Sequence, residues 1–90
     1  MTTTTTPIAD LHAREVVTVE GRITAITVEP KDAAPRLTAR IDDGTGRVDA
    51  VFMGRRAIAG IEPGARVSLT GRLCDAEAAL RLYNPRFEIR

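Results

Sequence analysis

The chain has 90 residues, 43% of them hydrophobic, and its 13 basic and 12 acidic residues leave a formal net charge of +1. This length supports one small domain with a single core. Net charge gives no strong basic excess, so it does not by itself point to nucleic acid. Twelve of the thirteen basic residues are Arg, which either serve phosphate binding and base stacking or reflect the codon bias that also makes the chain rich in Ala.

Cysteine use and hydropathy bear on the compartment. Cys74 is the single cysteine, which excludes a disulfide within the chain and favours the reducing cytoplasm. The first residues lack the charged and apolar regions of a secretion signal, and no stretch approaches the roughly 18 to 20 apolar residues of a membrane span. We therefore expect a soluble cytoplasmic protein without a membrane partner.

The N-terminal residues look unlike the rest of the chain. Residues 2–6 are five consecutive Thr, followed by Pro7, a polar repetitive run without apolar spacing. Ile8 and Leu11 suggest only a short lead-in, in which Asp10 is a candidate helix cap. We predict a flexible N-terminal arm over residues 1–13 and one domain over residues 14–90.

Residues 15–29 are rich in β-branched side chains and predict one long strand. The apolar residues occupy odd positions up to Ile23 and even positions from Ile26 onward. A period of two that changes parity indicates a bulge or bend. Gly21 lies where such a strand would have to coil sharply, which is typical of a barrel.

Residues 36–53 predict a hairpin of two alternating strands around an Asp-Gly-Thr-Gly turn. A turn centred on Gly44 and Thr45 aligns the apolar faces, pairing Ile41 with Val48, Ala39 with Ala50 and Leu37 with Phe52. The same register places opposite charges across the outward face, pairing Arg40 with Asp49 and Asp42 with Arg47. Arg36 faces Met53, without a carboxylate opposite it.

The second half of the chain supplies two further strands. Residues 55–59 predict one helical turn ended by Gly60, with Ile58 and Ile61 pointing inward. Residues 66–73 predict a fourth strand whose buried side chains are Val67, Leu69 and Leu73, with Gly71 as a second bend. Residues 80–90 form a fifth strand, interrupted at Asn84-Pro85, where proline argues for an edge or a bulge.

Together these elements predict an all-β fold, a five-stranded antiparallel Greek-key barrel with a short helical turn between strands 3 and 4, which is the OB-fold plan. The runs VTVEGRITAITV, IDDGTGRVDAVF, IEPGARVSLTGRL and LYNPRFEI resemble OB-fold nucleic-acid-binding domains of the anticodon-binding type. More narrowly, they resemble the wedge domain of bacterial RecG helicase and short stand-alone bacterial OB-fold proteins. The resemblance covers about residues 15–90 and implies single-stranded or junction DNA, or RNA, as the ligand. It does not imply helicase activity, because the chain lacks the G-x-x-x-x-G-K-[ST] phosphate loop.

No catalytic constellation is visible in the sequence. His12 is the only histidine and lies in the predicted arm, while Cys74 lacks a partner for nucleophilic or metal chemistry. Asp42 and Asp43 beside Gly44 are ordinary turn residues. We predict a protein that is not an enzyme, with no cofactor, no metal site and no catalytic residues.

OB-folds usually bind ligands on the face of strands two and three, so the outward residues there and beside them become the candidates. Phe52 and Phe87 fit inward positions, whereas Tyr83 points outward and serves either to stack a base or to cap the barrel edge. The predicted nucleic-acid-binding residues are Arg36, Thr38, Arg40, Arg47, Val51, Met53, Arg55, Arg56, Tyr83 and Arg86.

Two functions follow from this set. The first is a sequence-tolerant nucleic-acid-binding module of modest, salt-sensitive affinity, because opposite charges pair within the hairpin and aromatic residues are few. The alternative is an OB-fold adaptor that binds a protein or forms a homodimer through Val51 and Met53. Near-neutral charge favours this alternative.

Overall fold

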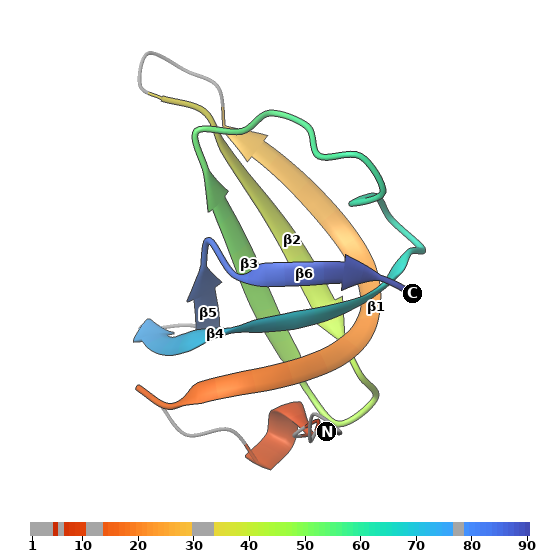
Figure 1. Cartoon of the computed structure of the whole chain (residues 1–90), viewed down its shortest axis with the longest axis vertical. Helices are drawn as coiled ribbons and strands as arrows, with labels where there is room; N and C mark the ends of the chain where they lie inside the picture. Colours follow the sequence, from red (N-terminus) through yellow and green to blue (C-terminus); the bar gives the residue numbers. More distant parts are fainter. Residues whose placement is uncertain (1–4, 6, 11–13, 30–33, 77–78) are drawn as a thin grey trace.

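The computed structural model describes residues 5, 7–10, 14–29, 34–76 and 79–90, so His12 and Leu11 lie outside it. It confirms the predicted all-β class (Figure 1). Within the described residues no helix is long and apolar enough to cross a membrane. The elements are a 3-10 turn η1 (Ile8–Asp10) and the strands β1 (Val16–Glu29), β2 (Arg36–Asp42), β3 (Arg47–Met53), β4 (Arg66–Ala76), β5 (Ala79–Tyr83) and β6 (Arg86–Ile89).

One sheet contains all six strands, in the order β1-β2-β3-β5-β4-β6, with β1 and β4 also paired. The pairings therefore run from β1 through β2, β3, β5 and β4 back to β1, and β6 adds to the free side of β4. The predicted fifth strand is two strands, β5 and β6, because the chain is interrupted at Asn84-Pro85 as expected. The prediction of a wholly antiparallel sheet was wrong at one place, since β3 and β5 are parallel.

The long first strand serves two partners. Its N-terminal half pairs with β4 and its C-terminal half with β2, and Arg22 belongs to both ladders (Figure 1). The register shifts between Ile23 and Ala25, which confirms the predicted bulge. A Cβ atom on Gly21 would lie only 2.7 Å from the backbone oxygen of Asp42. Glycine at this bend therefore lets the end of β2 approach β1 closely.

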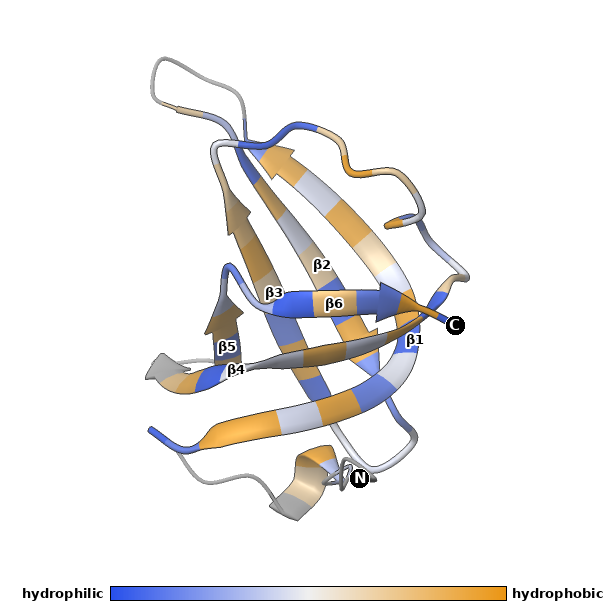
Figure 2. Ribbon diagram, viewed as in Figure 1, coloured by the Kyte–Doolittle hydropathy of each residue, from blue (hydrophilic) through white to orange (hydrophobic). Residues whose placement is uncertain are grey.

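The predicted hairpin register is confirmed at every pair, including Ile41 with Val48 and Leu37 with Phe52. Alternate residues along β1, β2 and β4 point into one core, which explains the alternating bands of hydropathy on these strands in Figure 2. Phe52 and the half-buried Phe87 meet edge to face, with ring centroids 5.7 Å apart. Both phenylalanines therefore serve packing, as expected.

The predicted helical turn over residues 55–59 was wrong: these residues form no helix. Gly54 and Gly60, which flank these residues, have φ angles of 76° and 84°, so the chain turns sharply at both ends of the segment. The predicted anchors Ile58 and Ile61 are nevertheless buried. Segment 54–65 thus crosses one end of the barrel as a series of turns held by two side chains (Figure 1).

The turn between β2 and β3 binds the N-terminal segment. Asp43 accepts hydrogen bonds from the backbone NH of Ile8 at 2.8 Å and of Thr45 at 2.8 Å, and from the Thr45 hydroxyl. Burial by itself would raise the pKa of Asp43, but these hydrogen bonds outweigh it and lower the pKa below its ordinary value. Ile8, which the sequence places in the flexible arm, is 3% exposed and packs into the core.

Candidate nucleic-acid interface

The outward side chains of β2, β3 and β5 form one surface, which we call the Tyr83 face. Two cross-strand rows define it, because partners in adjacent strands share a side of the sheet. The first row joins Thr38, Val51 and Tyr83, and the second joins Arg40, Asp49 and Arg81. The parallel pairing of β3 with β5 therefore brings the C-terminal part of the chain onto the hairpin face predicted from the sequence.

Tyr83 is 42% exposed, as predicted for an outward aromatic residue. The Arg81 Nη1 donates a hydrogen bond to the Tyr83 hydroxyl oxygen over 3.3 Å. The pKa of Arg81 is raised above its ordinary value by this hydrogen bond first, then by electrostatic attraction to Tyr83, and less by Asp49 and Glu29. Arg81 is thus a fixed positive charge that orients the ring, which leaves the phenolic proton free to donate to a ligand.

Two arginines of this face are held by carboxylates. Arg40 Nε lies 3.2 Å from Asp49 Oδ1, which confirms the predicted pair, and Arg36 Nη2 lies 3.0 Å from Glu29 Oε1 of β1. The second partner was not anticipated, because the register of β1 against β2 could not be assigned from the sequence. Both guanidinium groups are partly exposed, and ion pairs of exposed arginines contribute about 0 to 1 kcal/mol, so a phosphate can compete for either arginine.

The second charge pair that the hairpin register predicts is not formed. Asp42 and Arg47 are cross-strand partners as expected, but no ion pair joins them. Asp42 instead accepts a hydrogen bond from the backbone NH of Gly44 over 2.7 Å. This local turn contact competes with the cross-strand contact and leaves the Arg47 side chain exposed.

Two residues predicted to face solvent are buried. Val51 is 1% exposed and Asp49 is 7% exposed, although both point to the outer side of the sheet. The cause is β5, which lies along β3 and gives Val51 a neighbour on each side, Thr38 and Tyr83. Val51 therefore supports the face from below and offers no platform for a base, while Met53 is 48% exposed.

Asn84 is a positioning residue that sequence reasoning passed over. Its backbone NH donates to the Val51 oxygen over 2.7 Å, and its side-chain oxygen accepts from the Met53 NH over 2.9 Å. Its φ of 49° turns the chain out of β5 immediately after Tyr83. Asparagine tolerates this left-handed conformation, so the Asn-Pro dipeptide was the available signal.

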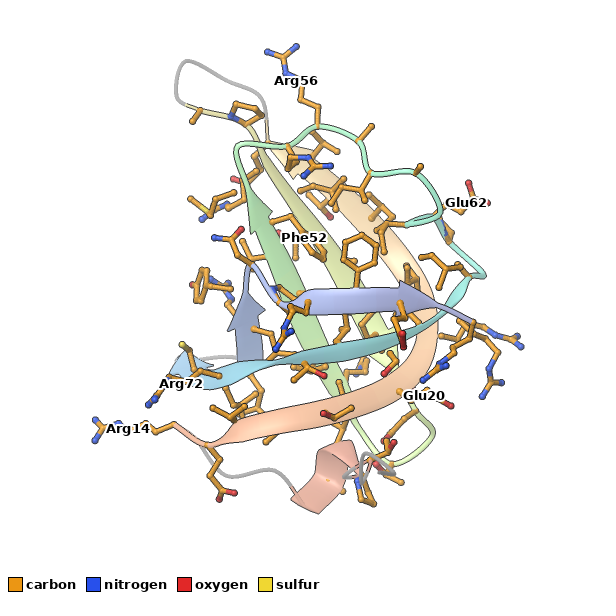
Figure 3. The ribbon with its side chains drawn as sticks, in the orientation of Figure 1. Arg14, Glu20, Phe52, Arg56, Glu62 and Arg72 are labelled. Carbon is orange, nitrogen blue, oxygen red and sulfur yellow. The ribbon has the colours of Figure 1, made fainter. Side chains whose placement is uncertain are left out.

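The remaining predicted arginines do not join the Tyr83 face. Arg55 and Arg56 are exposed in the segment after β3, and Figure 3 shows Arg56 directed away from the barrel. Arg86 lies on β6, where it lines a shallow pocket of about 440 Å³ together with Thr18, Ser68, Thr70, Phe87 and Glu88. The structure thus brings together Arg36, Thr38, Arg40, Met53 and Tyr83, with Arg47 at the end of the hairpin.

The described residues were also searched for a cluster of metal-ligating side chains. Among them, no group of three or more His, Cys, Asp or Glu residues could hold a metal ion. Cys74 is half-buried on β4, as expected for a packing residue. What the described surface offers is an exposed ring, guanidinium groups and hydroxyls, which suit the binding of a polyanion with stackable bases.

Comparison with known proteins agrees with this chemistry. A family model described as an OB-fold nucleic acid binding domain matches residues 17–90. A sequence search of curated proteins gives no match.

Solved structures of similar fold include the HINb domain of p204, with 21% identity and a TM-score of 0.77 over 97% of this chain and 47% of that one. RecG bound to a three-way DNA junction is 20% identical, with a TM-score of 0.76 over 97% of this chain and 12% of that one. The second OB-fold domain of replication protein A from Methanococcus maripaludis is 15% identical, with a TM-score of 0.73 over 96% and 94% of the two chains. This chain thus spans about half of the p204 chain and about an eighth of RecG.

Proposed function

Because the chain belongs to the family of OB-fold nucleic-acid-binding domains, we propose that it is a binding module for single-stranded or branched DNA. Such domains are generally binding modules rather than catalysts. The observation that carries the proposal is the Tyr83 face, where an exposed aromatic ring, fixed by Arg81, lies in one sheet with Arg36 and Arg40. Stacking on an aromatic ring tolerates any base, so the binding is sequence-tolerant.

The affinity is modest and depends on salt. Arg36 and Arg40 each exchange a carboxylate partner for a phosphate, so each new contact yields only the difference between two ion pairs. Displacement of counterions from the strand supplies the rest, and this contribution weakens as salt increases. The single cysteine is compatible with this activity in the cytoplasm.

A titration of the whole chain into fluorescein-labelled oligothymidylate, followed by fluorescence anisotropy in low and physiological salt, tests the proposal. We expect micromolar binding in low salt that weakens as salt is added. An oligouridylate of the same length separates DNA from RNA. Absence of binding to either oligonucleotide at tens of micromolar in low salt would overturn the proposal.

For the alternative of an adaptor or homodimer, one of the two residues expected to make the contact is buried. It required Val51 and Met53 to form an exposed apolar pair, and only Met53 is exposed.

A further inference from the structure

A row of arginines crosses the bend of β1, beyond the end of the Tyr83 face. Arg22 pairs with Arg66 of β4 in one ladder and with Asp42 of β2 in the other. Arg90, directly after β6, donates its backbone NH to the Arg66 oxygen over 2.7 Å, so it extends the register of β4 with β6. Arg47 lies opposite Asp42 on β3. We call Arg47, Arg22, Arg66 and Arg90 the arginine row.

The central pair of this row places two residues of like charge directly opposite each other on β1 and β4. The NH of Ile23 donates to the Ala65 oxygen over 2.8 Å, so Arg22 and Arg66 form the neighbouring pair without hydrogen bonds. In such antiparallel pairs the Cα atoms approach to about 4.5 Å and the side chains lie on the same side of the sheet. Like charges placed directly opposite each other destabilise a sheet. The fold therefore keeps an arrangement that local stability disfavours.

The acidic residues around this pair are already engaged elsewhere. Glu20 of β1 and Glu88 of β6, each two residues before an arginine of the row, are both bound by Arg90, at 3.3 Å and 3.6 Å. The Asp42 carboxylate accepts a hydrogen bond from the backbone NH of Gly44. Within the described residues Arg22 and Arg66 make no ion pair, and both are exposed.

The position of the row links it to the Tyr83 face. Arg47 and Asp42 are the next outward pair after Arg40 and Asp49 on the same hairpin, and the row continues from there over β1 to β4. Adjacent strands lie about 4.8 Å apart, so the step from Arg47 to Arg66 covers about 14 Å of barrel surface. Figure 1 shows the bend of β1, the start of β4 and the C-terminus meeting at one corner of the barrel.

From this geometry we propose that the arginine row, with Arg22 and Arg66 at its centre, is a second phosphate-binding surface for the same nucleic acid. It engages the backbone of the strand after the strand leaves the Tyr83 face. This inference rests on the proposed function. The positive charge of the row complements a polyanion. Because the row has no exposed aromatic ring, we expect it to contact phosphates and not bases.

The test compares two double variants with matched charge. Arg22→Gln with Arg66→Gln neutralises the centre of the row. The control, Arg14→Gln with Arg72→Gln, also removes two positive charges, but at the opposite end of the β1 and β4 pair. Figure 3 shows both side chains there. The probes are fluorescein-labelled oligothymidylates of about 6 nucleotides, which the Tyr83 face alone can accommodate, and about 20 nucleotides, which extend beyond it.

We expect the Arg22 and Arg66 variant to bind the long probe about tenfold more weakly in low salt, and the short probe within twofold of the wild type. Its slope of log K against log salt on the long probe should be shallower by about 1.4, corresponding to two phosphates of a single strand. The control variant should stay within twofold on both probes. Thermal unfolding of the Arg22 and Arg66 variant should be unchanged or shifted upward, because a repulsion is removed.

Equal affinity and equal salt slope of the two double variants on the long probe would overturn the inference while leaving the proposed function intact. Equal weakening on both probes would also overturn it, because the row would then belong to the Tyr83 face. If the wild type binds neither probe in low salt, the proposed function fails and the inference fails with it.

Discussion

The arginines of the Tyr83 face and those at the centre of the arginine row differ in how they are paired with carboxylates. On the Tyr83 face each of Arg36 and Arg40 is matched by a carboxylate at hydrogen-bonding distance. In the arginine row, Arg22 and Arg66 face each other without such a partner among the described residues. The first arrangement favours the fold and weakens its own attraction for phosphate, and the second does the reverse. Under the two proposals above, the Tyr83 face stacks the bases and the arginine row binds the phosphates, so the two kinds of contact come from different strands.

The largest expected effect concerns the bend that joins the two regions. In Gly21→Ala the new methyl group would meet the Asp42 oxygen at 2.7 Å and Ile41 Cγ2 at 2.9 Å, so β1 could not keep its place between β2 and β4. We expect a loss of about 3 kcal/mol in the free energy of unfolding, measured by urea denaturation. Gly71→Ala is the control, because its nearest contact is the Pro85 ring at 3.3 Å and its cost should stay below about 1 kcal/mol. Equal costs would contradict the special role of Gly21.

Stacking gives the next largest effect and concerns the Tyr83 face alone. Tyr83→Ala removes the exposed ring, and we expect about tenfold to hundredfold weaker binding of the six-nucleotide probe, since stacking contributes roughly 1 to 3 kcal/mol per base. Tyr83→Phe keeps the ring and loses only the hydroxyl that accepts from Arg81. It should retain most of the affinity in the anisotropy titration. If both variants bind like the wild type, the ring is a cap of the barrel edge and not a binding platform.

A substitution of Asp43, in the turn between β2 and β3, should change the stability of the protein without changing its affinity for nucleic acid. Asp43→Asn removes the carboxylate that accepts from Ile8 and Thr45, and we expect a loss of about 1.5 kcal/mol in unfolding free energy at neutral pH. Because the folded-state pKa lies below the ordinary value, this contribution is complete above about pH 4 and disappears as the pH falls through the folded-state pKa. Chemical denaturation from neutral to acid pH should therefore show the two proteins converging. A difference in unfolding free energy between the two proteins that stays constant down to the lowest pH would contradict this role of the Asp43 carboxylate. A changed affinity for the short probe would also contradict it.

Sequence patterns predicted what depends on neighbours along the chain. The alternation of residues 36–53 predicted the hairpin register, and the parity change between Ile23 and Ile26 predicted a bulge or bend in β1, where the register shifts between Ile23 and Ala25. The burial of Val51 was not predictable, because it depends on β5 lying parallel to β3. The role of Arg81 depends on the same pairing.

Contacts between distant segments were equally hidden. Ile8 is a single apolar residue after a polar run, so nothing near it in the sequence shows that Asp43 binds its amide. Arg22 and Arg66 become neighbours only because β1 bends and pairs with two strands. Such contacts require the whole topology, which alternation within single strands cannot supply.

The smallest effect tests whether the charge pairs of the Tyr83 face restrain binding. In Asp49→Asn the shape of the side chain is kept, but Arg40 loses its carboxylate at 3.2 Å. The freed guanidinium no longer has to leave an ion pair in order to meet a phosphate, a difference of about 0.5 to 1 kcal/mol. We expect the variant to bind the six-nucleotide probe about two- to fivefold more tightly in low salt, with a steeper salt dependence. Arg40→Gln should shift both quantities in the opposite direction. Weaker binding by Asp49→Asn, with unfolding unchanged, would mean that Asp49 holds Arg40 in its binding position, and the charge pairs would then assist the ligand instead of competing with it.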